Sequence, residues 1–378
     1  MFTMWPQDFD WSWHLIRPIA EGIYGGGEFN EIYRAAERMT LGDKESWYRE
    51  WLHLAEEIDG RGGQAEAAGH TISARDHYLR ACNYYRWAEF FLLPEDTRRV
   101  HTYDRCVACF RAAGRYFTPP LEQVEVPYED TTLPGYFYPA LNAGGKKAPG
   151  LVYVAGADVL KEELYFLGGR AAIERGMALL VVDMPGQGET LRHRGIVSRP
   201  DYEVPVGAAI DYLQRRPEVD DSRIALMGRS FGGYYAARAA AFEKRLRACA
   251  IFGALYDGVD LYDTYPPIRN QLRWLTGAKD LEDARERLKA FSLKGVVDKI
   301  SCPLLVVHGE DDHLVPARHA QRTYDEARTE KQLILYKPGE PGSIHCSYDG
   351  FPYTIPALFD WLADRLAVRP RSSAGATP

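Results

Sequence analysis

The second half of the chain contains short, almost wholly apolar segments separated by stretches with helical character. "GLVYV", "ALLVV", "IALM", "ACAIF" and "LLVV" are rich in Val, Leu and Ile, and each is followed closely by glycine or a polar residue. Strands that are buried on both faces have this continuous apolar character, whereas half-exposed strands alternate. The segments therefore predict an α/β fold with a mostly parallel central sheet that is covered by helices on both faces.

The first part of the chain lacks such runs and has helical periodicity. In "DKESWYREWLHLAEEI" the apolar residues Trp47, Trp51, Leu54 and Ile58 recur at helical spacing, with acidic residues between them. Two more helices are predicted over "SARDHYLRACNYYRWAEFFL" and "DTRRVHTYDRCVACFRAAGRYF". The glycine-rich "GRGGQAEAAGH" is expected to interrupt the helical structure between the first two. We therefore predict an all-helical N-terminal cap domain over residues 1–118.

Capping residues, chain length and loop length predict where the third helix starts and how the rest of the chain is divided. Asp96 or Thr97 can cap the third helix. The α/β domain is expected over residues 119–368, since 378 residues exceed what a single core usually organises. Residues 255–300 are too long for an ordinary crossover and contain helical pieces, so they predict a lid insertion. Residues 369–378, "RPRSSAGATP", predict a disordered tail.

A serine between two glycines stands where an apolar strand gives way to helix-forming residues. In "ALMGRSFGGYYAARAA", Ser230 lies between Gly228 and Gly232. G-x-S-x-G at a sharp strand-to-helix turn is a nucleophile elbow, in which the hydroxyl is held above the sheet and its neighbours must be small. The motif predicts Ser230 as a nucleophile. The backbone N–H of Phe231, at the start of the helix, is a predicted donor to an oxyanion.

A serine hydroxyl needs a base to remove its proton and a carboxylate to orient that base. On this kind of fold the partners follow the serine in the order acid, then histidine. "LLVVHGEDDHLVP" carries Asp311 and Asp312 in a turn after a buried strand, and either carboxylate could orient the base or cap the next helix. His345 lies in the loop "GEPGSIHCSYDG" before the final helix and is the predicted base.

A second oxyanion donor is expected from the loop "AGADVLKEE", which follows the strand "GLVYV". Ala157 is the first choice for this backbone N–H, and Asp158 is the alternative. The glycines of "VVDMPGQGET" lack the third glycine of a dinucleotide-binding motif, so this segment predicts a structural turn.

No cofactor and no metal ion are predicted. The spacing of His308, His313 and His319 fits no single helical face. Cys106 and Cys109 form a CxxC within a predicted helix, with no second Cys or His pair nearby, so a zinc or redox site is not expected there.

Composition excludes several classes of partner. A net charge of -7 argues against a nucleic-acid-binding protein. No run of 18 apolar residues is present, so no membrane span is predicted. The six cysteines are scattered, mostly in apolar surroundings, and this favours buried free thiols and a cytoplasmic protein. The sequence leaves a homodimer open.

With these motifs in this order, residues 120–367 resemble the α/β-hydrolase fold, of which "DMPGQGET" and "HGEDDHLVP" are familiar pieces. "SARDHYLRACNYYRWAEFFL", "AGADVLKEE" and "GRSFGGYYAAR" narrow the resemblance. They resemble the group that contains 2,6-dihydroxypseudooxynicotine hydrolase, fermentation-respiration switch esterase-like proteins and fungal hydrolases that shorten polyketide chains. The resemblance covers nearly the whole chain.

The resemblance implies a serine hydrolase that cleaves a carbon–carbon bond next to a ketone, or an ester, in an aromatic or polyketide-like small molecule. Ser230 would be the nucleophile, His345 the base and Asp312 the orienting acid, because the family's spacing favours Asp312 over Asp311. Phe231 and Ala157 would supply the backbone donors.

Some relatives that cleave carbon–carbon bonds use an additional acid near the nucleophile. Asp257, Asp260 and Asp263 in "LYDGVDLYDTYPP" are candidates for that role, but the sequence favours their being ordinary acidic residues on the lid surface. Two other functions remain open on the same scaffold: a biosynthetic acyl transferase, cyclase or lactonase with the same triad, and a binding protein without catalysis.

Overall fold

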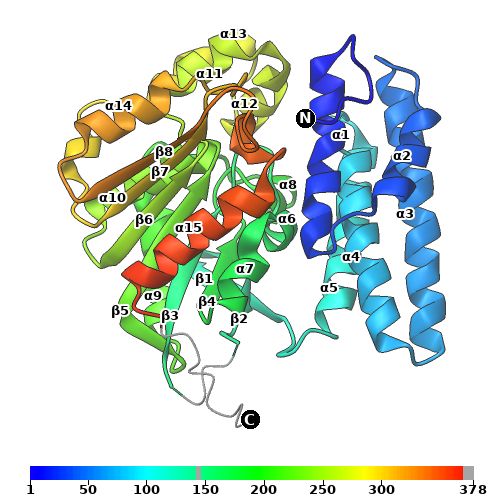
Figure 1. The fold of residues 1–378 in the computed structure, drawn as a ribbon, viewed down its shortest axis with the longest axis horizontal. Coiled ribbons are helices and arrows are strands. Elements are labelled where there is room, and N and C mark those ends of the chain that lie inside the picture. The colour runs from blue at the N-terminus through cyan, green and yellow to red at the C-terminus, as the bar shows by residue number, and fades with distance from the viewer. Residues whose placement is uncertain (142–145, 369–378) are drawn as a thin grey trace.

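The computed structural model describes residues 1–141 and 146–368, and the predicted tail at 369–378 lies outside the described residues. A group of long helices at the N-terminus lies beside a sheet that is flanked by helices (Figure 1). The N-terminal helices are α1 (Phe9–Glu21), α2 (Phe29–Glu37), α3 (Lys44–Ala67), α4 (Thr71–Ala88) and α5 (Thr97–Gly114). The predicted cap of α5 is confirmed, because the Asp96 carboxylate accepts the backbone N–H of Arg98.

The predicted glycine-rich interruption is wrong. Helix α3 continues through Gly60, Gly62 and Gly63 and ends at Ala67. A Cβ atom at Gly62 would lie 2.7 Å from Cε1 of Tyr78, so α3 and α4 approach each other closely at this glycine. Packing between the two helices outweighs the low helix propensity of glycine.

The sheet has eight strands in the order β1-β2-β4-β3-β5-β6-β7-β8. Strands β1 and β2 pair antiparallel, as do β2 and β4, and the remaining pairs are parallel. The prediction of a mostly parallel sheet is confirmed. The strands are β1 (Glu122–Tyr128), β2 (Thr131–Tyr138), β3 (Ala148–Val154), β4 (Ala178–Val182), β5 (Val219–Arg229), β6 (Leu246–Phe252), β7 (Leu304–Gly309) and β8 (Lys331–Tyr336).

Helices cover both faces of the sheet, with α7 and α15 packed together on one face and α9 packed against α10 on the other (Figure 1). A further group of helices lies between β6 and β7. The helices of this half are α6 (Lys161–Leu164), α7 (Arg170–Glu174), α8 (Gly188–Arg192), α9 (Glu203–Gln214), α10 (Phe231–Phe242), α11 (Gly258–Thr264), α12 (Arg269–Leu275), α13 (Leu281–Leu288), α14 (Arg318–Glu326) and α15 (Phe351–Arg365).

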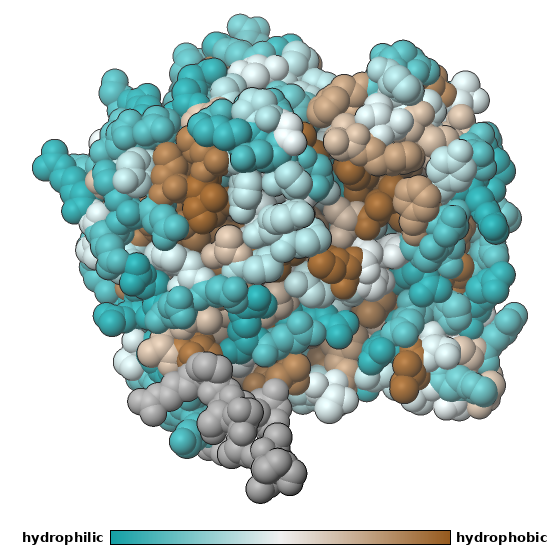
Figure 2. Space-filling view, in the orientation of Figure 1, coloured by the Kyte–Doolittle hydropathy of each residue, from teal (hydrophilic) through white to brown (hydrophobic). Residues whose placement is uncertain are grey.

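The surface is largely hydrophilic over the strand-bearing half (Figure 2). On the face shown, hydrophobic side chains gather near the N-terminal end of α1, where Met1, Phe2 and Phe9 are exposed. Across residues 1–141 and 146–368, no helix combines the length and the apolar character that a bilayer crossing requires.

Candidate active site

Ser230 occupies a strained turn between β5 and α10. Its backbone angles are φ 56° and ψ -122°, and a positive φ is uncommon for a residue other than glycine. A Cβ atom at Gly228 would lie 1.9 Å from the carbonyl oxygen of Gly232, and one at Gly232 would lie 2.5 Å from that of Ala155. The turn therefore requires glycine on both sides of the serine, and it presents the hydroxyl at the carboxyl end of the sheet.

The hydroxyl of Ser230 lies at one end of a chain of side-chain contacts. Its Oγ is 2.9 Å from Nε2 of His345, and Nδ1 of His345 is 2.6 Å from Oδ2 of Asp312. The other oxygen of Asp312 accepts the backbone N–H groups of Leu314 and Val315, at 2.9 and 2.8 Å. These bonds hold the carboxylate toward the imidazole, so the structure brings the three predicted residues together.

Asp311 lies in the same turn and has a different environment. Its Oδ2 accepts the hydroxyl of Ser343 at 2.9 Å and the backbone N–H of Gly339 at 3.3 Å. Asp311 is exposed, whereas Asp312 is buried. The geometry therefore selects Asp312 from the two carboxylates that the turn offers.

Electrostatic neighbours set the protonation of the imidazole. Burial alone would lower the pKa of His345, but the Asp312 carboxylate and the Cys346 side chain together raise it to about 10. Burial likewise opposes ionisation of Asp312, and the attraction of His345 outweighs it, so the pKa of Asp312 is lowered. The pKa of Cys346 is also lowered, against the effect of burial, by His345 and Arg229. These neighbours thus stabilise the cationic form of the imidazole, which is the form that a base takes after it accepts a proton.

Both predicted backbone donors belong to segments that lie next to the serine. Phe231 is the first residue of α10, where backbone N–H groups have no partner within the helix. A Cβ atom at Gly156 would lie 3.1 Å from Cβ of Ser230 and 3.6 Å from its Oγ. The loop over residues 155–158, here called the oxyanion loop, therefore passes directly beside the hydroxyl, and Ala157 is buried within it.

Three long polar side chains hold the carbonyl groups of the oxyanion loop, and none of them was found from the sequence. Gln187, just before α8, donates to the carbonyl of residue 155 at 2.7 Å. Gln271, on α12, donates to the carbonyl of residue 157, also at 2.7 Å. Arg86, on α4, donates to the carbonyl of residue 158. The loop is therefore held jointly by the N-terminal helices, the segment between β6 and β7, and the α/β half.

The three candidate auxiliary acids lie elsewhere. Asp257 caps α11, with its carboxylate accepting two backbone N–H groups. Asp260 pairs with Arg318, at 2.6 Å, and Asp263 pairs with Arg285, at 2.6 Å. Within the described residues none of the three acids lines the cavity at Ser230. This placement agrees with the interpretation of the three as ordinary acidic residues of the lid, since each is engaged in helix capping or an ion pair.

A cavity of about 370 Å³ opens onto Ser230 and His345. Its walls come from α1, from α4 and the segment after it, and from the region of α11 and α12. Asp10 and Asp158 are the acids that line it. Its aromatic lining residues are Trp11, Trp13, Phe90, Phe91, Tyr265 and Tyr348.

The histidines considered as metal ligands point to separate partners. Nε2 of His308 donates to the carbonyl of Val315 at 2.7 Å, and Nε2 of His319 lies 2.6 Å from Asp260. The ring of His313 packs edge-on against Trp13. Over the described part of the chain, no group of three or more His, Cys, Asp or Glu residues is arranged to hold a metal ion.

Comparison with known proteins gives the family. The model of the esterase FrsA-like family matches residues 41–367. The chain belongs to the FrsA-like esterase family. It is 28% identical to hydrolase acrC of Aspergillus aculeatus, over 98% of this chain and 99% of that protein. It is 30% identical to α/β hydrolase psoB of Aspergillus fumigatus, over 95% of this chain and 93% of that protein.

A solved structure agrees with this assignment. The crystal structure of 2,6-dihydroxy-pseudo-oxynicotine hydrolase superposes with a TM-score of 0.82 at 26% identity, covering 95% of this chain and all of that one. The predicted α/β-hydrolase fold and the resemblance to this group are confirmed. This FrsA-like protein is therefore an enzyme, a hydrolase of the α/β fold.

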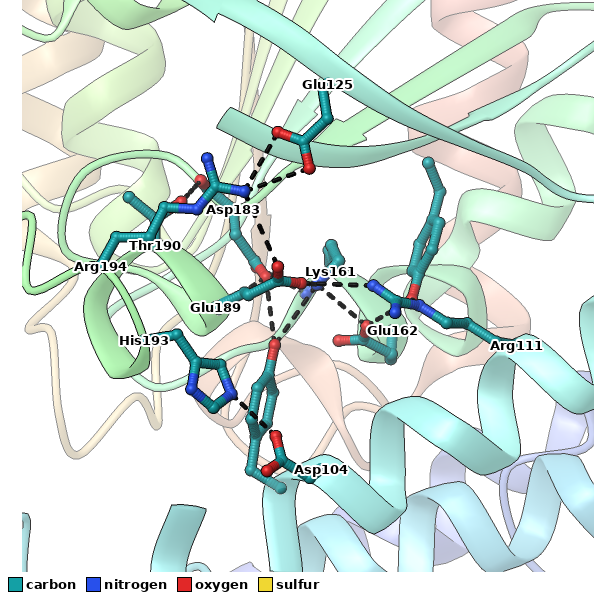
Figure 3. A network of polar contacts seen from close by, with 12 residues as sticks. Asp104, Arg111, Glu125, Lys161, Glu162, Asp183, Glu189, Thr190, His193 and Arg194 are labelled. Atoms are coloured by element: carbon teal, nitrogen blue, oxygen red, sulfur yellow. Dashed lines mark hydrogen bonds and ion pairs between the residues drawn. The ribbon is translucent and has the colours of Figure 1, made fainter. Parts of the chain in front are cut away.

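A second polar cluster joins α5 to the α/β half of this FrsA-like hydrolase (Figure 3). Lys161 is fully buried, with Nζ 2.6 Å from Oδ2 of Asp183 and 3.1 Å from Oε1 of Glu162. The hydroxyl of Tyr103, on α5, lies 3.3 Å from the same nitrogen. Arg111, also on α5, pairs with Glu189 at 3.3 Å. We call this group of six residues the Lys161 cluster: Tyr103, Arg111, Lys161, Glu162, Asp183 and Glu189.

Proposed function

We propose that this FrsA-like hydrolase uses Ser230, His345 and Asp312 as a catalytic triad to cleave a carbon–carbon bond next to a ketone, or an ester. The observation that carries the proposal is the continuous set of contacts from Asp312 through His345 to Ser230, which ends at a cavity with aromatic walls. A serine on a strained turn, a buried imidazole and an orienting carboxylate in these roles perform acyl transfer on unrelated folds.

In the first step, Nε2 of His345 takes the proton of the Ser230 hydroxyl while Oγ attacks the substrate carbonyl carbon. Asp312 stabilises the imidazolium that forms, which agrees with the raised pKa of His345. The oxyanion would be bound by the backbone N–H groups of Phe231 and Ala157. A single donor of this kind typically contributes about 3–4 kcal/mol to the stability of the transition state.

In the second step, the tetrahedral intermediate collapses and the bond to the leaving group breaks. His345 returns its proton to the leaving carbon or oxygen, and the acyl group stays on Ser230. Water, activated by the neutral imidazole, then releases the acid and restores the serine. A carbon leaving group departs with an electron pair, so it must be an enolate or an electron-poor ring.

The proposed substrates are aromatic or polyketide-like small molecules. Aromatic rings stack on aromatic walls, and a cavity of about 370 Å³ suits a molecule of a few rings. The superposed 2,6-dihydroxy-pseudo-oxynicotine hydrolase is named for a small-molecule substrate, and this supports a small organic molecule as the substrate here. The proposed chemistry needs no metal ion and no cofactor.

The test is Ser230→Ala, with Ser222→Ala at an exposed position as the matched control. Ser230→Ala is expected to lower kcat on aryl ketones or benzoate esters by at least about 10³-fold and to abolish labelling by a fluorophosphonate. Ser222→Ala should leave both unchanged. Incorporation of ¹⁸O from water into the acid product distinguishes hydrolysis from acyl transfer. Undiminished turnover or labelling in Ser230→Ala would refute the triad.

A further inference from the structure

The peptide unit that carries the N–H of Ala157 lies between two peptide units whose carbonyl groups are held by side chains. Gln187 donates to the carbonyl of residue 155 at 2.7 Å. Gln271 donates to the carbonyl of Ala157, also at 2.7 Å. A peptide unit is planar, so a bond that holds its carbonyl also fixes the direction of its N–H. The direction of the Ala157 N–H therefore depends on the two neighbouring planes that these glutamines hold.

The amide of Gln271 can hold the oxyanion loop in only one of its two orientations. A side-chain amide has a donor nitrogen at one end and an acceptor oxygen at the other, and a half-turn exchanges them. Nη2 of Arg99, on α5, donates to Oε1 of Gln271 at 3.1 Å. A guanidinium has donors only, so it can pair with the amide oxygen and not with the amide nitrogen. Arg99 therefore directs Nε2 of Gln271 toward the carbonyl of Ala157.

Arg99 is itself held by several buried partners. Its Nε donates to Oε2 of Glu89 at 3.1 Å, and its Nη1 donates to the carbonyl of Leu92 at 3.0 Å. Its guanidinium carbon lies 4.4 Å from the centre of the ring of Trp274, which belongs to the same helix as Gln271. Each of the three nitrogens thus has a partner, and the planar guanidinium presents Nη2 to Gln271 in a fixed direction.

A second arginine binds the same carboxylate without reaching the oxyanion loop. Nη2 of Arg192, on α8, lies 2.6 Å from Oε1 of Glu89. Within residues 1–141 and 146–368, Arg192 donates neither to Gln271 nor to the oxyanion loop. Arg99 and Arg192 are both buried cations that neutralise Glu89, and they differ in the bond from Arg99 to Gln271. Arg192 is therefore a matched control for Arg99.

We propose that Arg99 is a positioning residue for the oxyanion site: it fixes the orientation of the Gln271 amide and, through it, the direction of the Ala157 N–H. The inference rests on the proposed function. Arg99 acts through Gln271 and not on the substrate. Since Arg99 belongs to α5, the N-terminal helices take part in stabilising the transition state in addition to covering the cavity.

The first test compares Arg99→Lys with Arg192→Lys on the ester 4-nitrophenyl benzoate. Each substitution keeps a cation near Glu89, but a lysine has one nitrogen and lacks the planar set of donors that reaches Gln271. Arg99→Lys is expected to lower kcat about three- to tenfold, the range for one hydrogen bond, with KM changed less than about twofold. Arg192→Lys should leave kcat within about twofold of the wild-type value.

A double-mutant cycle separates positioning from a general loss of structure. If Arg99 acts through Gln271, Arg99→Lys should lower kcat no further in a protein that already carries Gln271→Ala. A multiplicative loss in the double variant would show that Arg99 acts independently of Gln271, and it would overturn the proposal.

Gln271→Glu keeps the proposal testable if Arg99→Lys does not fold. The new carboxylate pairs with the Arg99 guanidinium but has no donor for the carbonyl of Ala157. Compared with Gln271→Ala, which loses both contacts, Gln271→Glu should have an equal or lower kcat and an equal or higher midpoint of urea unfolding. A lower midpoint would show that Arg99 does not hold this side chain, and a wild-type kcat would show that the bond to Ala157 does not matter. Either result overturns the proposal.

The outcomes distinguish the positioning role from the proposed function. A wild-type protein that cleaves the ester and reacts with a fluorophosphonate, together with equal kcat values for Arg99→Lys and Arg192→Lys, would overturn the positioning role and leave the triad intact. A wild-type protein that neither cleaves the ester nor reacts with the fluorophosphonate would overturn the proposed function itself. A selective loss of kcat in Arg99→Lys that disappears in the Gln271→Ala background supports both.

Discussion

The proposed triad and the Lys161 cluster are both buried polar networks, but they differ in how sequence encodes them. Ser230, Asp312 and His345 each stand on a turn or loop at the carboxyl end of a strand, and the backbone of each turn constrains its neighbouring residues. The Lys161 cluster joins charged and tyrosine side chains from α5, α6, α8 and the end of β4, and no fixed spacing in the sequence relates these residues (Figure 3). A network leaves a recognisable motif when the backbone itself must take an unusual form.

The two networks also differ in what their charges do. In the triad, His345 changes protonation during each proposed turnover, so its charge is part of the reaction. In the Lys161 cluster, one buried ammonium neutralises carboxylates that would otherwise be buried without a counter-ion. We therefore expect substitutions in the triad to change rate with little change in stability, and substitutions in the Lys161 cluster to change stability first.

The largest stability effect is expected for Lys161→Met. The substitution leaves Asp183 and Glu162 buried without their cation, which typically destabilises a protein by about 3–5 kcal/mol. The measurement is the free energy of unfolding from urea denaturation, followed by circular dichroism. The matched control is Arg170→Met, which removes an exposed pair with Glu174 and should cost at most about 0.5 kcal/mol. If Lys161→Met is as stable as Arg170→Met, the distinction between the two networks fails.

The parts of the site that were predicted from sequence share a local cause. Gly228 and Gly232 flank Ser230 because any side chain there would collide with backbone, so a close approach in three dimensions appears as a pattern within five residues. The apolar runs likewise identified the parallel sheet, since burial on both faces leaves a strand almost no polar positions.

The parts that were missed depend on contacts between distant segments. Gln271 is 114 residues from the carbonyl group to which it donates, and nothing in the sequence around it indicates that contact. Asp257, Asp260 and Asp263 have the right charge and approximately the right place in the chain, but local sequence does not reveal the direction of a side chain. Gly60, Gly62 and Gly63 led to a wrong prediction for a related reason, since the packing of Tyr78 against α3 is a tertiary contact.

Gln271→Ala tests whether a contact between distant segments positions the site, because Gln271 links the segment between β6 and β7 to the oxyanion loop. Loss of its donated bond to residue 157 is expected to lower kcat about tenfold, with little change in KM or in the unfolding free energy. A loosened loop presents its N–H groups poorly to the transition state and alters ground-state binding less. The measurement is a steady-state comparison with Asn270→Ala, a neighbouring cavity-lining residue on the same helix. An equal effect of both substitutions, or an effect on KM alone, would contradict the positioning role.

The smallest expected effect is a shift in pH dependence for Cys346→Ala. The Cys346 thiol lies 3.5 Å from Nε2 of His345, and Cys346 is one of the groups that raise the pKa of His345 to about 10. The neutral imidazole is the proposed base, so the rate should rise with pH through the pKa of His345. Removing Cys346 lowers that pKa, so the rising limb of kcat/KM should move to lower pH.

The pH profile of Cys249→Ala is the control for Cys346→Ala. Cys249 is also a buried free thiol, but it lies within β6, where its Sγ contacts the carbonyl of Ala236. Removal of the Cys249 thiol should leave the pH dependence of kcat/KM unchanged. A Cys346→Ala profile that moves to higher pH, or that coincides with the wild-type profile, would show that Cys346 does not tune the imidazole. A shift to lower pH without loss of stability would instead confirm that Cys346 acts on the imidazole and not on folding.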